Sequence, residues 1–391
     1  MQSGQNKNIK SGLKPYATLD MWRGVASLCV VMHHASSTIT GRFAALGTAP
    51  LYRVGELGFL GVQIFFVISG YCIAGAACSA LRRSDGWWAF MRARLRRVYP
   101  PLWFSLALIV AFGLLARGLV ASGRIHGSTL ADKDVLHLSA AFYLSNLTLT
   151  QMVFHQTLLS IVCWTLCYEV AFYVIVSLFL VGRRPRGETV LLTGLHLVTV
   201  SALVLLVAAP QFRFFPLDLW PQFGLGALVY DVLRHPHQAR PRWWLLAAGV
   251  TAAAFILSRS FGVGPLAEPS RLTFAVAFVF ALLLLFLYRH DDALGSVPMI
   301  RWLTGIGLFS YSLYLTHFLT LGLVNQASRM MHLTASAHLL ILAACFAAAL
   351  LVARIFYQFF ERPFVQTTHR LPSPPPVTAA DQGRLAESRP H

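Results

Sequence analysis

Long apolar segments separated by short polar ones make up most of the chain. A helix needs about 20 mostly apolar residues to cross the hydrocarbon core of a bilayer. Ten segments approach or reach that length, at residues 19–40, 56–80, 100–121, 159–181, 188–208, 216–233, 243–260, 272–288, 303–325 and 337–360. The pattern therefore predicts an all-α fold, that of a polytopic membrane protein with about ten transmembrane helices.

Polar segments set the predicted domain boundaries. Residues 1–18 are polar and contain no short apolar core followed by a cleavage site, so we expect no signal peptide. Residues 366–391 are polar and Pro-rich, which is typical of disorder. The sequence thus predicts a cytoplasmic segment at 1–18, an integral-membrane domain at 19–365 and a disordered cytoplasmic tail at 366–391. A further apolar stretch, 135–150, is too short to span and is interpreted as interfacial or re-entrant.

The composition excludes a set of soluble domains, which 391 residues would otherwise suggest. Hydrophobic residues make up 56% of the chain and charged residues 12%, against about 45–50% and 25% in soluble domains. The mean hydropathy is +0.61. Most of the chain must therefore be surrounded by membrane lipids or by other apolar segments.

The net charge of +17 arises from few acidic residues, since Lys and Arg number 32 and Asp and Glu 15. The basic residues form short clusters between apolar segments, as the positive-inside rule places them, so we expect no nucleic-acid partner. With ten spans, 21 Lys and Arg fall on the side of the N-terminus and nine on the other. This bias predicts that both termini are cytoplasmic.

Six cysteines all fall within apolar segments and have no metal-like spacing. We interpret them as buried small hydrophobic residues and expect no metal site.

Ionisable residues inside membrane helices are costly, so each is a candidate functional residue. Segment 19–40 contains Asp20, Arg23, His33 and His34. Arg23 and His34 are eleven positions apart, which puts them on one helical face about 16 Å apart along the axis, with His33 about 80° away. Asp20 is close enough to Arg23 to pair with it. The alternative is a snorkelling arginine with a structural histidine.

Glu169 and His317 are further candidates inside predicted spans. Glu169 is near the middle of segment 159–181, where a carboxylate must be protonated, paired or hydrated. His317 lies in segment 303–325, where a packing role and a functional role are both open.

Four arginines occur in six residues, Arg92, Arg94, Arg96 and Arg97, in the predicted cytoplasmic loop 81–99. Such a cluster is ordinarily topogenic or binds lipid headgroups. The second hypothesis is a phosphate-binding site, because Arg makes bidentate contacts to phosphate oxygens.

Six segments in order along the chain carry a resemblance: Leu19–Ala26 with His34 following, Gly61–Tyr71, Phe90–Pro100, Trp164–Tyr173, Ser310–His317 and Glu361–Pro363. From Leu19 to Val365 the sequence resembles the type-3 family of integral-membrane acyltransferases, which O-acylate sugars of bacterial lipopolysaccharide, exopolysaccharide, Nod factors and peptidoglycan. Trp164–Tyr173 is most similar to the version in exopolysaccharide-modifying members. Three positions depart from the family pattern: Met21, His33 and Gln63.

The resemblance implies a multi-pass protein of the bacterial inner membrane that transfers an acyl group, most simply acetyl from acetyl-CoA, to a hydroxyl of an extracytoplasmic or lipid-linked glycan. The donor is a substrate, and no permanently bound cofactor is expected. The alternative is a transporter or translocase of a polysaccharide precursor without acyl-transfer chemistry.

The resemblance also assigns roles. His34 is the expected general base or transient acyl carrier, with Arg23 and Glu169 as the other catalytic residues. The arginines at 92, 94, 96 and 97 are expected to bind CoA phosphates. Supporting or substrate contacts are expected from Asp20, Gln63, Trp164, Tyr168 and His317.

Overall fold

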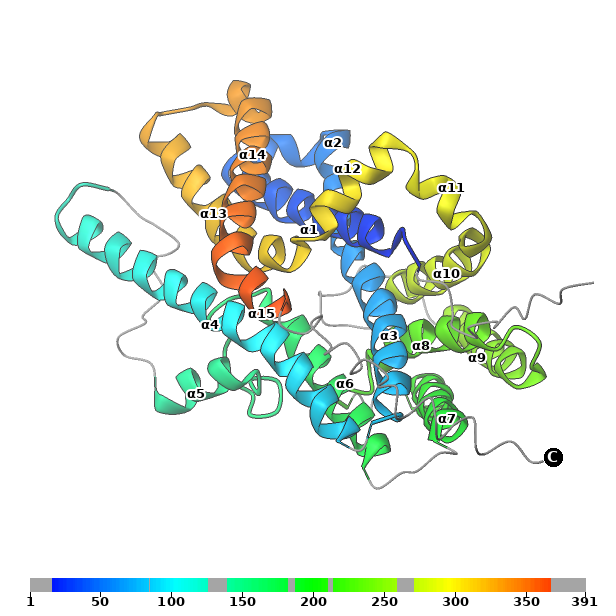
Figure 1. The fold of residues 1–391 in the computed structure, drawn as a ribbon. Coiled ribbons are helices and arrows are strands. Elements are labelled where there is room, and N and C mark those ends of the chain that lie inside the picture. The colour runs from blue at the N-terminus through cyan, green and yellow to red at the C-terminus, as the bar shows by residue number, and fades with distance from the viewer. Residues whose placement is uncertain are drawn as a thin grey trace, which may run out of the picture.

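The computed structural model describes residues 16–83, 85–125, 139–181, 187–209, 214–258 and 271–366. Within these ranges all regular structure is helical (Figure 1). The α-helices are α1 (Leu19–Arg42), α2 (Pro50–Glu56), α3 (Gly61–Ala80), α4 (Gly86–Ala121), α5 (Ala140–Thr148), α6 (Cys163–Leu180), α7 (Gly187–Ala208), α8 (Trp220–Arg234), α9 (Ala239–Ser258), α10 (Arg271–Leu287), α11 (Asp291–Gly295), α12 (Pro298–Gly307), α13 (Ser310–Met330), α14 (His338–Phe356) and α15 (Arg362–Gln366). The predicted all-α class is confirmed.

Six helical segments of the described chain are long and apolar enough to cross a membrane, or seven if the bent pair α12–α13 forms one span. The chain is thus a multi-pass membrane protein, while the count of about ten spans and the cytoplasmic termini stay predictions. Helices α1, α8 and α9 match predicted spans but do not meet these limits. With 15 residues, α8 is about 22 Å long, shorter than the hydrocarbon core of about 30 Å.

The predicted terminal segments 1–18 and 366–391 lie outside the described residues, apart from 16–18 and residue 366.

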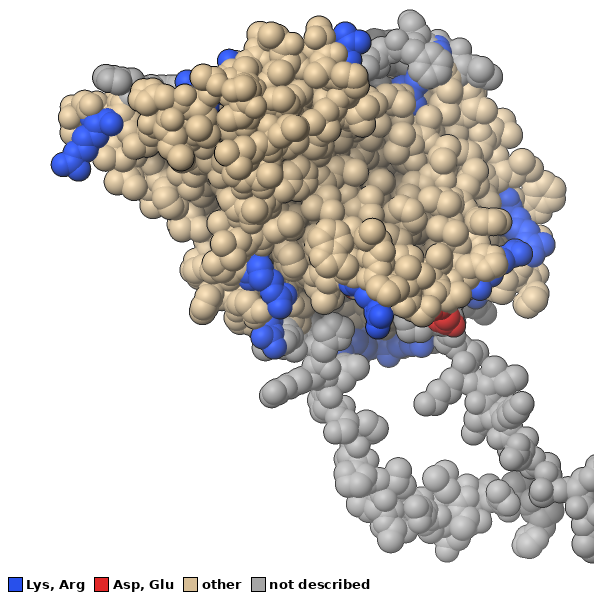
Figure 2. All heavy atoms as spheres, turned by 90° about the horizontal axis from the view of Figure 1, so that it is seen from above, with Lys and Arg blue, Asp and Glu red and all other residues tan. Residues whose placement is uncertain are grey.

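The charged residues are distributed as a membrane protein requires. Figure 2 shows one face of the molecule as a wide surface of uncharged side chains, with Arg side chains gathered along its borders. Apolar side chains such as Leu178, Val279 and Leu351 are 62–66% exposed. An exposed apolar belt between charged borders fits a surface that contacts lipid tails.

The prediction of a loop at 81–99 is wrong from residue 86 onward. Helix α4 begins at Gly86 and continues for 36 residues through Pro100 and Pro101, a length of about 54 Å. Each proline removes one backbone donor from the helix. The hydroxyl of Tyr311 donates to the carbonyl of Val98 (2.8 Å) and ties α13 to α4 beside the two prolines. The arginine cluster is therefore helical.

A single asparagine organises the region between α5 and α6. Asn146 donates to the carbonyls of Phe142 and Thr157 and accepts from the backbone N–H of Leu159 and from the side chain of Gln151. Helix α5, with nine residues, is about 13 Å long and too short to span, as predicted for the stretch 135–150. The hydrogen bonds of Asn146 fix the residues that lead into α6.

A break between α12 and α13 bends the chain by 71°. Glu361 is buried and accepts hydrogen bonds from the backbone N–H and the hydroxyl of Ser312, at 3.0 and 2.5 Å. A carboxylate at this position satisfies free donors in the first turn of α13 and interacts favourably with the helix dipole. Glu361 thus helps to fix the start of α13.

Helices α3 and α8 pack closely because each has a glycine that faces the backbone of the other helix. A Cβ atom at Gly70 would collide with the carbonyl of Phe223, and one at Gly226 would collide with the carbonyl of Val67. Since both obstacles are backbone atoms, the two helices would have to separate to admit a side chain.

We expect Gly70→Ala to destabilise the protein by about 1–3 kcal/mol, the usual cost of overpacking, and to lower Tm in detergent by several degrees. The matched control is Gly322→Ala in α13, where an added Cβ meets open space and the alanine favours the helix. Equal Tm values for the two variants would contradict the close approach of α3 and α8.

Candidate active site

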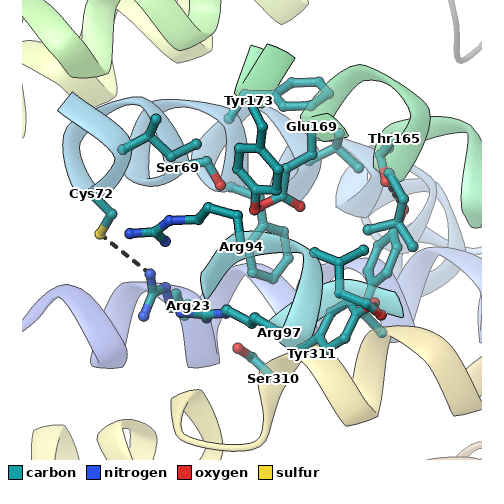
Figure 3. Close-up of a pocket in the computed structure, with 17 residues that line it drawn as sticks. Arg23, Ser69, Cys72, Arg94, Arg97, Thr165, Glu169, Tyr173, Ser310 and Tyr311 are labelled. Carbon is teal, nitrogen blue, oxygen red and sulfur yellow. Dashed lines mark hydrogen bonds between the residues drawn. The ribbon is translucent and has the colours of Figure 1, made fainter. Parts of the chain in front are cut away.

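Five helices meet at a pocket that we call the arginine pocket (Figure 3). Its polar lining comes from α1, α3, α4, α6 and α13: Arg23, Ser69, Cys72, Arg94, Arg97, Thr165, Glu169, Tyr173, Ser310, Tyr311 and Tyr314. Three arginines and one glutamate therefore line a cavity within a bundle of mostly apolar helices. Charged groups in such a place are typical of a binding site or a reaction site.

Arg23 is held by two neighbours. Its Nη1 donates to Asp20 Oδ1 at 2.7 Å, one turn earlier on α1, and its Nη2 contacts Cys72 Sγ of α3 at 3.3 Å. The pairing of Asp20 with Arg23 is as predicted. Asp20 itself does not line the pocket. Arg23 therefore faces the pocket, while its ion pair with Asp20 lies on the side away from the pocket.

The four arginines of α4 divide between two faces. Arg94 and Arg97 line the pocket, whereas Arg92 and Arg96 are exposed to the surroundings. At 100° per residue the first two are about 60° apart and the second two about 40° apart, on roughly opposite sides of the helix. The structure therefore brings two of the four predicted phosphate ligands into the pocket.

Arg94 has unused binding capacity. Its Nε is buried without a hydrogen-bond partner, and within the described chain no carboxylate forms a salt bridge with Arg94 or Arg97. In Figure 3 the guanidinium groups of Arg23 and Arg94 lie near Cys72, at the α3 end of the pocket. Guanidinium groups without a carboxylate partner are suited to an anionic ligand.

Glu169 lies on the α6 side of the same pocket. It accepts a hydrogen bond from the hydroxyl of Tyr173, one turn later on α6 (2.5 Å). The arginine pocket thus brings together Glu169 and Arg23, two of the three predicted catalytic residues.

The third member of the predicted triad, His34, lies in a neighbouring pocket, which we call the histidine pocket. This pocket is lined by Val30, His33, His34, Phe59, Val62, Ile161, Val162, Trp164 and Tyr314. Val62 and Tyr314 line both pockets and form the boundary between them. Eleven helical positions on α1 separate Arg23 from His34 by about 16 Å, so the triad is divided between two adjoining compartments.

Two of the three nearby histidines are bound to backbone carbonyls. His33 Nδ1 lies 2.7 Å from the carbonyl oxygen of Glu56, and His317 Nδ1 lies 3.0 Å from that of Leu313. A carbonyl oxygen can only accept, so each Nδ1 is the donor. The ring nitrogens of His34 form no hydrogen bond with the described residues, which leaves His34 free to bind a substrate.

The other predicted support residues take different positions. Trp164 lines the histidine pocket. Tyr168 lies behind Trp164, at a ring-centroid distance of 6.0 Å, and donates to Asp218. Gln63 is buried on α3 and lines neither pocket. Trp164 is thus placed to touch a ligand, whereas Tyr168 supports it by packing.

Seven polar residues of the arginine pocket were not among the predicted site residues, and Cys72, Tyr173 and Tyr314 illustrate why. Tyr173 follows Glu169 by four residues, and this spacing places both on one helical face. Tyr314 precedes His317 by three residues on the same face. Cys72 gives no such signal, because only the packing of α3 against α1 brings it to Arg23.

A family model of the acyltransferase domain matches residues 16–358. A protein described as a membrane-bound transacylase, BcsY of Komagataeibacter xylinus, is 26% identical over 88% of this chain and 85% of its own length. The acyltransferase MdmB of Streptomyces mycarofaciens is 26% identical over 92% and 93% of the two chains. The O-acetyltransferase OatA of Staphylococcus aureus is 26% identical over 69% of this chain, which spans 47% of OatA. No solved structure matches.

The pocket position of Cys72 can be tested by chemical labelling. Cys72 is partly exposed in an electropositive pocket, whereas Cys78 lies six residues later on α3 and is buried. We expect N-ethylmaleimide to modify Cys72 several-fold faster than Cys78, since access and a positive environment favour thiol reaction. Mass spectrometry after partial reaction compares both thiols in one protein. Faster modification of Cys78 would contradict the position of Cys72 in the arginine pocket.

Proposed function

The chain belongs to the acyltransferase family, and we propose that it transfers an acetyl group from acetyl-CoA, on the cytoplasmic side of a bacterial inner membrane, to a hydroxyl of an extracytoplasmic or lipid-linked glycan. The observation that carries this proposal is the pair of adjoining pockets along α1, one lined by arginines and the other by His34. The two pockets supply one binding site for an anionic donor and one for a neutral acceptor.

The arginine pocket suits the phosphates and the arm of CoA. Arg94 and Arg97 offer charge-assisted hydrogen bonds to phosphate oxygens, and both lie in the half of α4 that precedes Pro100. Arg23 lies beside Cys72, about 16 Å along α1 from His34, and can hold the pantetheine arm. The positive-inside bias predicts that this half of α4 is cytoplasmic, on the side where acetyl-CoA is available.

The histidine pocket is the proposed place of the chemical step. His34 removes the proton of the acceptor hydroxyl while the hydroxyl oxygen attacks the thioester carbonyl carbon. The carbon–sulfur bond then breaks, and the CoA thiolate receives the proton from His34. An imidazole is suited to this exchange because its ordinary pKa lies close to neutral pH.

The relatives support acetyl as the group and oxygen as the acceptor atom, since OatA is named an O-acetyltransferase and BcsY a membrane-bound transacylase. Family membership favours an enzyme over the alternative of a translocase. Turnover of acetyl-CoA by the purified protein, with a glycan acceptor present, separates the two functions directly, since a translocase releases no CoA.

We expect His34→Ala to lower the release of CoA from acetyl-CoA by about 10²–10⁴-fold, the usual contribution of a general base. The matched variant is His33→Phe, which should retain substantial activity because the His33 ring is hydrogen bonded to the backbone carbonyl of Glu56. CoA release and glycan acetylation are measured on folded protein of unchanged Tm. Equal losses in the two variants would contradict the assignment of His34.

We expect Arg94→Ala and Arg97→Ala each to raise the KM for acetyl-CoA about 10-fold to 100-fold, as the loss of a charge-assisted hydrogen bond predicts. Lysine at either position should restore only part of the affinity, because it lacks the planar fork. Arg92→Ala on the exposed face of α4 is the comparison and should change KM much less. If all three variants bind the donor normally but insert poorly, the cluster is topogenic.

A further inference from the structure

His317 is the most buried of the histidines beside the histidine pocket. It comes from α13, is 0% exposed and lies against His34 with the two ring centroids 5.2 Å apart. It does not line either pocket. His317 therefore cannot meet a substrate directly, but it can act on His34.

The tautomer of His317 is fixed by its backbone contact. Nδ1 donates to the carbonyl of Leu313 (3.0 Å), so in the neutral ring Nε2 carries the lone pair. Nε2 is buried and has no hydrogen-bond partner within the described chain. A buried acceptor without a partner is unfavourable and is found where a ligand or a moving group completes it.

The groups around His317 leave His34 as the available donor. The hydroxyl of Tyr314 is engaged with Thr165 (2.7 Å) and with the carbonyl of Val162 (3.0 Å). Nδ1 of His33 is engaged with Glu56. The ring of Phe318, the next residue, has no polar atom and packs edge-on against His34.

We propose that His317 is a positioning residue whose Nε2 accepts an N–H of His34 during the reaction. This inference rests on the proposed function. With one nitrogen of His34 held as the donor to His317, the other keeps its lone pair for the acceptor hydroxyl. The two rings lie side by side without a hydrogen bond between them, and catalytic hydrogen bonds often tighten only when substrate binds.

The proposal accounts for both halves of the proton transfer. When His34 takes the hydroxyl proton it becomes an imidazolium with two N–H groups, one of which is held by the lone pair of His317. The proton gained from the hydroxyl then passes to the leaving CoA thiolate, and His34 returns to its starting tautomer. His317 keeps its own proton on Nδ1 throughout, so no further reactant is needed.

Two substitutions distinguish positioning from packing. In His317→Asn the amide nitrogen can take the place of Nδ1 and donate to Leu313, but nothing replaces Nε2. In His317→Gln the longer side chain can place its amide oxygen where Nε2 was. We expect the Asn variant to lose about 10²-fold in kcat, with the KM for acetyl-CoA unchanged, and the Gln variant to recover about 10-fold of that loss.

His338 provides a matched control, because its Nδ1 makes the same kind of bond to the carbonyl of Ala335 (2.9 Å) outside both pockets. His338→Asn and His338→Gln should leave kcat unchanged. Tm in detergent is measured for every variant. If the Asn variant does not fold, the Gln variant alone decides, with kcat expected within about 10-fold of the wild type.

Equal losses of kcat in the Asn and Gln variants, or no loss in either, would overturn the role of His317 while the wild-type enzyme still turned over acetyl-CoA. A folded wild-type protein that released no CoA in the presence of a glycan acceptor would instead overturn the proposed function itself. The two failures are thus read from different proteins in the same assay.

Discussion

Ionisable side chains inside an apolar helical bundle are stable only where they are paired, hydrogen bonded or open to water. Helix α1 carries four such residues, Asp20, Arg23, His33 and His34, on one element. Asp20 pairs with Arg23 on the same helix, Arg23 and His33 also contact groups of α3 and α2, and His34 lines a pocket. Helices α3 and α13, which pack against α1, both line the arginine pocket with it.

The straight course of α1 also sets the distance between the two pockets. A helix rises 1.5 Å per residue, so eleven positions separate the charge that meets the donor from the imidazole that meets the acceptor by about 16 Å. Close packing keeps this distance constant: a Cβ at Gly24 would collide with the carbonyl of Leu303, and one at Gly307 would collide with the carbonyl of Asp20. On the proposed function, α1 is the element that aligns a donor site with an acceptor site.

Contacts within one helix could be predicted from the sequence, whereas contacts between helices could not. The Asp20–Arg23 pair follows from spacing alone, and the positions of the apolar helices follow from hydropathy. The two faces of the arginine cluster were missed because the segment was interpreted as a loop, where no 100° step applies. The contact of His317 with His34 depends on how α13 bends away from α12, which no local pattern encodes.

The boundary between the pockets explains why dividing the triad is compatible with catalysis. A thioester that reaches His34 must be protected from water, or hydrolysis competes with transfer. Val62 and Tyr314 stand between the two compartments, and the Tyr314 hydroxyl is fixed by Thr165 and by the carbonyl of Val162. Tyr314 thus ties α13 to the start of α6, the same segment that Asn146 fixes from the other side. On the proposed function, the donor site and the acceptor site share the wall that Val62 and Tyr314 form, and the acyl arm has to cross that wall while the charged part of the donor stays among the arginines.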